Sequence, residues 1–201
     1  MTDSTAGTAT LERARDKRER LVDGACHAFY EQGVEHTTLA DIARIAYVPL
    51  GNVYYYFKTK DELVEAVIAA HAELVTATLA GLERHRNPKD RLKAFARLVR
   101  DQGDTAARFG CPQGTLCSEL DKRHDGLDRL ASELISIPID WAEQQFRAMG
   151  RRDARDLAVA LIASYQGISL LTNTLREPAL MAREARRLER WIDTLDTAAA
   201  R

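Results

Sequence analysis

The sequence predicts an all-α fold. Apolar residues recur near the helical period along most of the chain, while runs of alternating β-branched residues are few. Only 5 prolines and 11 glycines interrupt the 201 residues. With 45% hydrophobic and 29% charged residues, the chain can bury a sizeable core without disulfides or metals. We therefore expect about nine helices and no strands.

In the first third of the chain, the sequence predicts one long helix followed by two short helices. The long helix covers about residues 11–32, and its apolar positions lie on one face. Thr38, with Asp41 three positions later, predicts a capped short helix. Pro49 then suits the first turn of a second short helix. Two short helices joined by a tight turn form a helix-turn-helix, here at about residues 38–57.

The rest of the chain predicts a helical bundle. Thr59 and Glu62 have the spacing of a capping pair, and they precede a long amphipathic helix. A loop containing Arg108 to Cys111 separates two of the later helices, and Pro138 should kink or split another. The later helices are expected at about 87–102, from 112, at 124–149, at 153–174 and at 180–195.

Charge gives no general signature of a nucleic-acid partner. The chain has 29 basic and 30 acidic residues, and residues 1–60 alone carry eight of each. The positive charges nevertheless gather at 13–20 and 58–60, where two helices could flank a phosphate backbone. The first of these clusters is equally typical of ion pairs on a helix surface. Any DNA affinity must therefore come from a few placed contacts.

The cysteines and the N-terminus indicate a cytoplasmic protein. Three cysteines are an odd number for a disulfide framework, and their spacing fits no metal site. Residues 1–13 lack the features of a signal peptide and predict a disordered tail. Residues 157–175 carry no charge and approach the length of a membrane span, but seven polar side chains favour a helix buried in protein. We expect no membrane partner.

Residues 49–59 predict a helix with two unlike faces. The inner face is apolar or aromatic and comprises Pro49, Leu50, Val53, Tyr56 and Phe57. The outer face comprises Gly51, Asn52, Tyr55 and Lys58, with Tyr54 at the boundary. Four consecutive aromatic residues cover every direction of a helix, so some must be exposed. An exposed glycine, amide, phenol and ammonium suit the reading of DNA, although an aromatic cluster alone fits a protein partner equally well.

The run TTLADIARIAYVPLGNVYYYFKTKDEL, at residues 37–63, resembles the DNA-binding domain of TetR/AcrR-type transcriptional regulators. The resemblance extends over residues 14–74 and implies that three helices and the start of a fourth form this domain. It further implies that Thr38 and Lys60 contact the DNA backbone. The residues that it places in the major groove are Leu50, Gly51, Asn52, Tyr54, Tyr55 and Tyr56, to which the projection above adds Lys58.

Two positions depart from the family pattern. Tyr47 stands in the turn where glycine is usual, and a left-handed conformation there costs a tyrosine about 1–2 kcal/mol. A reshaped turn would avoid that cost. Pro49 stands where a capping serine is usual, so the following helix loses a side-chain cap and gains a fixed φ. These changes leave the pose of the reading helix open.

The remaining residues, 75–201, resemble the family's ligand-binding and dimerisation domain. The segment GCPQGTLCSEL, Gly110 to Leu120, is similar to the GCPxGxLxxEL segment of the LmrA/YxaF-like branch. In the wider family the last two long helices form a four-helix dimer interface. The matching apolar stripe comprises Leu180, Leu188, Trp191, Ile192 and Leu195, although a helix packed within its own subunit would show the same stripe.

Together these features predict a homodimeric repressor that binds a palindromic operator and is released by a small, apolar effector. The candidate effector contacts are His71, Trp141, Tyr165 and Gln166, each of which fits a plain core position as well. One alternative is a thiol switch that uses Cys111 and Cys117. Another is a small-molecule enzyme with an accessory DNA-binding domain, but we find no catalytic constellation. No cofactor or metal is expected.

Overall fold

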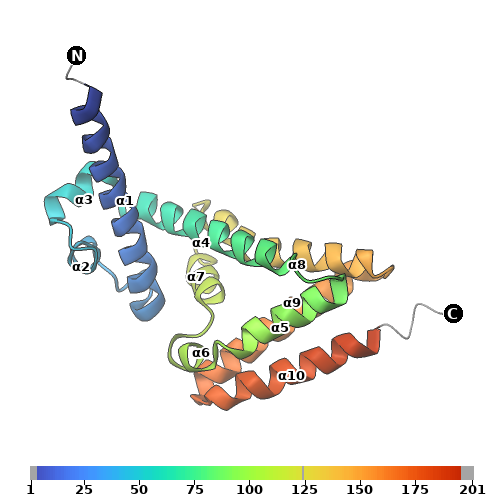
Figure 1. The fold of residues 1–201 in the computed structure, drawn as a ribbon. Helices are drawn as coiled ribbons and strands as arrows, with labels where there is room; N and C mark the ends of the chain where they lie inside the picture. The colour runs from blue at the N-terminus through green and yellow to red at the C-terminus, as the bar shows by residue number, and fades with distance from the viewer. Residues whose placement is uncertain (1–3, 124, 196–201) are drawn as a thin grey trace.

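The computed structural model describes residues 4–123 and 125–195, and within them the chain is entirely helical, which confirms the predicted fold class (Figure 1). The bounds are α1 (Ser4–Gln32), α2 (Leu39–Ile45), α3 (Leu50–Tyr56), α4 (Lys60–Leu82), α5 (Pro88–Arg100), α6 (Gly103–Phe109), α7 (Pro112–Leu120), α8 (Leu127–Ala148), α9 (Ala154–Leu175) and α10 (Pro178–Thr194).

The N-terminal helix begins earlier than predicted. α1 starts at Ser4, so residues 4–13 are helical where the sequence predicted a disordered tail, and residues 1–3 lie outside the described part. This stretch contains two alanines and no proline. Adding turns to an existing helix requires no new nucleus, which explains how a polar segment extends α1.

Two further differences concern the middle of the chain. α6 occupies part of the predicted loop and ends at Gly110, whose φ of 80° stops the helix. α8 continues through Pro138, which was expected to kink or split it. The loss of one backbone hydrogen bond is tolerated because α8 packs along α4, α7 and α9. The predicted start of this helix at His124 lies outside the described residues, and α8 begins at Leu127.

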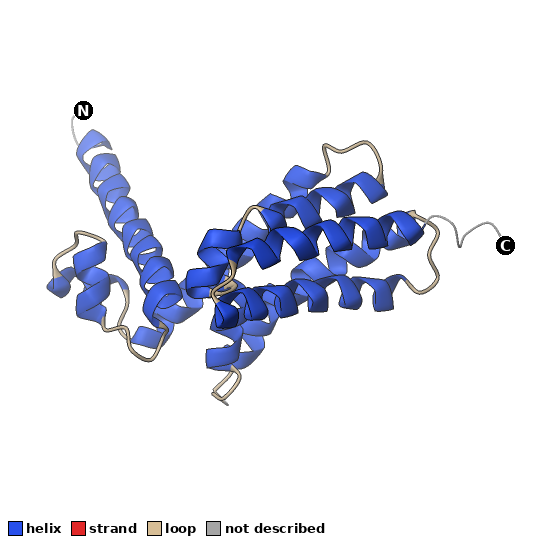
Figure 2. Ribbon diagram, turned by 90° about the horizontal axis from the view of Figure 1, so that it is seen from below, coloured by secondary structure: helices blue, strands red, loops and turns tan. Residues whose placement is uncertain are grey.

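The helices form two regions that share two long elements. α1 to α3 lie at one end, and a bundle containing α5, α8, α9 and α10 forms the other (Figures 1 and 2). Two buried clusters correspond to these regions, and α4 and α8 contribute to both. The first cluster also includes Leu116 and Leu120 of α7. The expected boundary near residue 74 thus falls inside the unbroken helix α4.

Two helices among the described residues, α4 and α9, are long and apolar enough to cross a membrane by length and composition alone. Core helices of soluble proteins pass the same test, so this is weak evidence. One face of α9 packs against α6, α8 and α10. The uncharged segment was expected to be buried on most sides, but only this face is covered, and Leu170, Leu171 and Leu175 on the other side are exposed.

Candidate nucleic-acid interface

The cap of α2 is formed as the sequence predicted. The amide of Asp41 donates to Thr38 Oγ1 at 3.2 Å, and the amide of Thr38 donates to Asp41 Oδ2 at 3.1 Å. The hydrogen bonds from Thr38 lower the pKa of Asp41, and Arg44 adds to this shift. The Thr38 side chain is held at the exposed start of α2, in a position suited to a phosphate contact.

The turn between α2 and α3 contains a tyrosine in the left-handed conformation. Tyr47 has a φ of 53° and is 87% exposed, so the turn is strained rather than reshaped. Arg20 of α1 holds it from outside, because its guanidinium donates to the carbonyls of Ala46 at 2.5 Å and of Tyr47 at 2.8 Å. No local sequence pattern indicates this role of Arg20, because the contact joins residues 27 positions apart.

Two buried side chains hold α3 against the domain. Val53 and Phe57 are at most 2% exposed, in agreement with the predicted inner face. The guanidinium of Arg18 lies 5.1 Å from the centroid of the Phe57 ring. Pro49 precedes the helix without a side-chain cap, while its carbonyl accepts from the amide of Asn52 at 2.8 Å. The contacts on its buried side therefore fix the orientation of α3.

The outer face of α3 is open and aromatic. Tyr54 is 52% exposed and Tyr55 73%, and a Cβ added to Gly51 would meet nothing within 4 Å. Leu50 is 43% exposed, so the helical projection, which placed it on the inner face, was wrong at this position. Tyr56 is half-buried, and its ring meets that of Tyr55 edge-on at 4.9 Å. Most of the predicted reading face is free to approach a groove.

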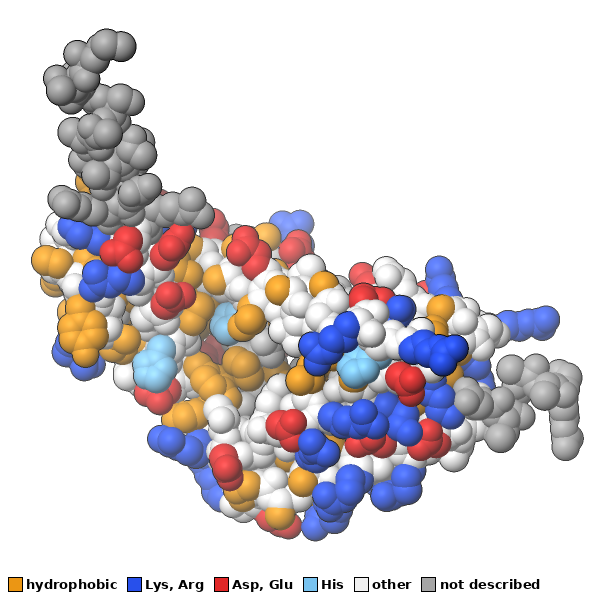
Figure 3. Space-filling model, viewed as in Figure 1, with side chains coloured by type: hydrophobic (Ala, Val, Ile, Leu, Met, Phe, Trp, Pro, Cys, Tyr) orange, Lys and Arg blue, Asp and Glu red, His pale blue; other side chains and the backbone are white. Residues whose placement is uncertain are grey.

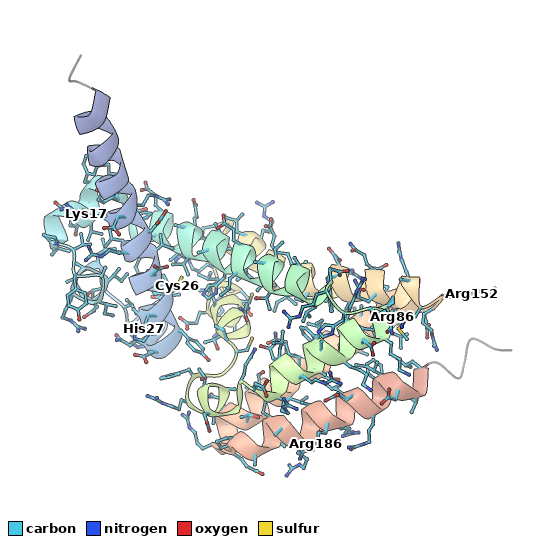
Figure 4. All side chains as sticks on the ribbon, viewed as in Figure 1. Lys17, Cys26, His27, Arg86, Arg152 and Arg186 are labelled. Carbon is cyan, nitrogen blue, oxygen red and sulfur yellow. The ribbon has the colours of Figure 1, made fainter. Side chains whose placement is uncertain are left out.

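Basic side chains flank this face. Lys58 is exposed and donates to the carbonyl of Tyr54 at 2.8 Å, and half-buried Lys60 donates to that of Glu35 at 3.4 Å. Lys17 lies on α1 near α3 (Figure 4). In Figure 3 hydrophobic side chains lie at the end of the molecule that carries α2 and α3, with basic and acidic side chains among them. Ammonium groups bordering an exposed phenol surface suit a nucleic acid.

A cavity of about 380 Å³ lies among α4 to α9 and reaches α1 at Tyr30. Of the predicted effector contacts, Tyr165 and Gln166 border it. His71 instead borders a much smaller cavity beside Cys26, and burial lowers its pKa. Trp141 is buried, and its indole donates to Glu83 Oε1 at 3.0 Å, as expected of a core residue. The cavity wall also contains Tyr30, Leu74, Val75, Thr78, Leu79, Phe95, Leu98, Val99, Asp101, Gln102, Thr105, Pro112, Gln113, Leu134 and Pro138.

Polar groups meet at one side of the cavity. The hydroxyl of Tyr165 donates to Gln102 Oε1 at 3.0 Å, and its oxygen lies 3.4 Å from the thiol sulfur of Cys111. The amide of Gln166 lies 3.6 Å from the same sulfur. Burial raises the pKa of Tyr165 well above its usual value, and Cys111 adds to the shift. The phenol therefore stays neutral and able to donate a hydrogen bond.

The apolar stripe predicted for the dimer lies within its own subunit. Leu180, Leu188 and Ile192 are buried where α10 packs on α5 and α9. The ring of Trp191 meets that of Phe146 at 6.2 Å, and Leu195 is half-buried beside the same cluster. α9 carries four exposed aliphatic side chains, more than any other described helix, and they are Val159, Leu170, Leu171 and Leu175.

Comparison with known proteins indicates the family. The sequence profile described as "Bacterial regulatory proteins, tetR family" matches residues 21–67, which carry the helix-turn-helix. The HTH-type transcriptional regulator TtgR of Pseudomonas putida is 28% identical over 198 residues, which cover 92% of each chain. The chain is similar to TetR-family transcriptional regulators. TetR-family members are DNA-binding transcriptional regulators and not enzymes.

Solved structures agree with this similarity to TetR-family regulators. A TetR transcriptional regulator from Chloroflexus aurantiacus has a TM-score of 0.79 at 26% identity, covering 90% of this chain and 96% of that one. SCO4454 of Streptomyces coelicolor reaches the same TM-score at 18% identity, covering 89% and 94%, which shows the fold alone. The nicotine-responsive repressor HdnoR of Paenarthrobacter nicotinovorans is 27% identical over 169 residues, covering 77% and 82%.

Proposed function

We propose that this chain is a TetR-family regulator and acts as a cytoplasmic, homodimeric repressor. Residues 14–74 form its reading domain, which binds a palindromic operator, and residues 75–201 bind the effector and the second subunit. The observation that carries the proposal is the exposed outer face of α3, because Tyr54, Tyr55 and Gly51 are open to a groove while Val53 fixes the helix beneath them. Two such helices would enter successive major grooves roughly 34–36 Å apart.

A mobility-shift experiment tests the DNA-binding half. The probe is the DNA upstream of the protein's own gene, and the competitor is a scrambled duplex of the same composition. We expect specific binding that weakens as salt rises, because phosphate contacts release counterions. Equal affinity for the scrambled duplex, or binding that salt does not affect, would contradict an operator-binding function.

The cavity walls point to an uncharged effector. Phe95, Tyr165 and several aliphatic side chains supply apolar contact, and glutamine amides supply hydrogen bonds. Asp101, the one carboxylate in the wall, is exposed and pairs with Arg100 at 2.8 Å. The Paenarthrobacter relative is described as nicotine-responsive, which supports a small organic molecule as the class of effector.

An uncharged fluorescent dye tests this assignment. Nile red should gain fluorescence on binding to the cavity, and it should release the operator, because it binds one conformer better than the other. A Val99→Arg variant places a charge in the cavity wall and should abolish both effects. The matched variant Leu130→Arg alters a partly exposed leucine on α8, outside the cavity wall, and should leave dye binding intact. Dye binding that survives Val99→Arg would contradict the assignment.

The exposed side of α9 supports a revised dimer contact. Val159, Leu170 and Leu171 fall on one face together with Ala163, and Gly167 between them permits close approach. A face of this kind costs free energy when left in water and marks an interaction site. We therefore assign the dimer contact to α9 rather than to the stripe of α10.

The thiol alternative finds less support in the geometry. Cys117 donates to the carbonyl of Ala131 on α8, whereas Cys111 faces Tyr165 on α9. Burial raises the pKa of Cys117 to about 11, so its reactive thiolate is scarce at neutral pH. Release of the operator by peroxide, lost on replacing both cysteines by serine, would restore this alternative. Membership of the LmrA/YxaF-like branch stays a proposal that rests on Gly110 to Leu120.

A further inference from the structure

The GCPQGTLCSEL segment forms α7 and the turn before it, and neither DNA contact nor dimerisation accounts for it. Gly110 has a φ of 80°, which favours glycine. Cys111 caps α7, since its sulfur accepts from the amide of Gly114 at 3.4 Å. A side chain at Gly114 would meet the side-chain amide of Gln166, and α7 itself packs against α8 and α1. The segment is built to hold α7 at one place between the two regions.

One end of α7 borders the effector cavity. Pro112 and Gln113, in its first turn, belong to the cavity wall. Tyr30 belongs to the same wall but comes from α1, the first helix of the reading domain. The Tyr30 hydroxyl donates to the carbonyl of Gly110 at 2.7 Å. The reading domain therefore touches both the cavity and the start of α7.

The other end of α7 is fastened to the reading domain. Glu119 Oε2 accepts from the amide of Val34, in the connection between α1 and α2, at 2.6 Å. Leu116 and Leu120 are buried in the same cluster as α1 and α4. Just beyond the helix, the Arg123 guanidinium lies 2.8 Å from Asp61 in the first turn of α4, directly after α3.

We propose that α7 transmits occupancy of the cavity to the reading domain, with Glu119 as the positioning residue at the receiving end. This inference rests on the proposed function and names how its two halves communicate. A nine-residue helix moves as a unit, so displacement of Pro112 by an occupant shifts Glu119 as well. Because Glu119 binds the chain between α1 and α2, that shift changes the position of α2 and α3. Figure 4 shows Cys26 on α1 at the level of α7, where the two helices meet.

A double-mutant cycle tests the transmission without knowledge of the effector. Leu98→Trp adds volume to the cavity wall from α5, and Glu119→Ala removes the contact to Val34. We expect Leu98→Trp to weaken operator binding about tenfold, which is within the usual range of coupling between two sites of one protein. In the Glu119→Ala background, Leu98→Trp should weaken operator binding by less than about threefold. Glu133→Ala removes an exposed carboxylate on α8 and should leave the tenfold effect in place.

The outcomes separate this inference from the proposed function. Failure of the wild-type protein to prefer the upstream DNA would overturn the proposed function. If the wild-type protein does prefer the upstream DNA, additive effects of the two substitutions would overturn transmission through α7 and would leave the proposed function standing. If Glu119→Ala fails to fold, amide exchange at Val34 replaces the cycle: it should be faster in Leu98→Trp than in wild type, and unchanged exchange would overturn the inference.

Discussion

Two faces of the molecule expose apolar side chains, and they differ in chemistry. The face on α3 consists of phenols and a leucine beside lysines, with Tyr54 and Tyr55 more than half exposed. The face on α9 consists of aliphatic side chains, with Leu170 65% and Leu171 51% exposed. Each is the uncovered side of a helix whose opposite side is buried.

The difference identifies the partner that each face suits. Phenols and ammonium groups can stay hydrated until they meet phosphates and base edges, so an uncovered α3 is tolerable without DNA. Leucine and valine side chains form no hydrogen bonds with water, so the α9 face is more stable when a second apolar surface buries it permanently. Substitutions on the two faces should therefore disturb different equilibria.

The largest effect is expected on α9. Leu171→Glu places a charge at the centre of the proposed dimer contact, and an unpaired buried carboxylate costs at least about 3 kcal/mol, or more than a hundredfold in dimerisation. Sedimentation equilibrium should show a monomer. Leu130→Glu, on a partly exposed leucine of α8, is the matched control and should remain dimeric. A dimeric Leu171→Glu protein would show that α9 is not the contact.

The next effect is expected on α3. Tyr55→Ala removes the most exposed phenol of the reading face, and we expect specific binding to weaken by about 1–3 kcal/mol, which is roughly tenfold or more. Asn52→Ala should in addition relax preference at one base pair. Titration of labelled operator measures both, and the dimer should persist. Unchanged affinity and sequence preference in both variants would show that α3 does not read the operator.

Sequence periodicity predicted which helices exist more reliably than it predicted what covers them. The inner and outer sides of α3 followed from 100° per residue, except at Leu50 near the start, where no neighbouring helix covers the side chain. The stripe of α10 was identified correctly as apolar, but only the structure shows that α5 and α9 bury it. The cavity wall draws on seven helices, including α1 through Tyr30, and no local pattern reports such an assembly.

A smaller effect concerns the strained turn that precedes the reading helix. Tyr47→Gly should raise the free energy of unfolding by about 1 kcal/mol, because glycine adopts a φ of 53° without the steric cost borne by tyrosine. Tyr47→Ala is the matched control, since it removes the ring and keeps the cost. Urea denaturation at one protein concentration compares them. Equal stability of the two variants would show that the positive φ carries no strain.

The smallest effect separates the two faces by their response to salt. Lys58→Gln removes one ammonium beside α3, at a position where the lysine donates to the carbonyl of Tyr54. If Lys58 contacts a phosphate, operator affinity should fall a few-fold for every sequence, and the slope of log affinity against log salt should decrease by about 1. Dimerisation through the aliphatic face of α9 involves no such counterion release, so its dependence on salt should not change. A slope equal to that of the wild type would place Lys58 away from the DNA backbone and leave the phenols of α3 as the main contact.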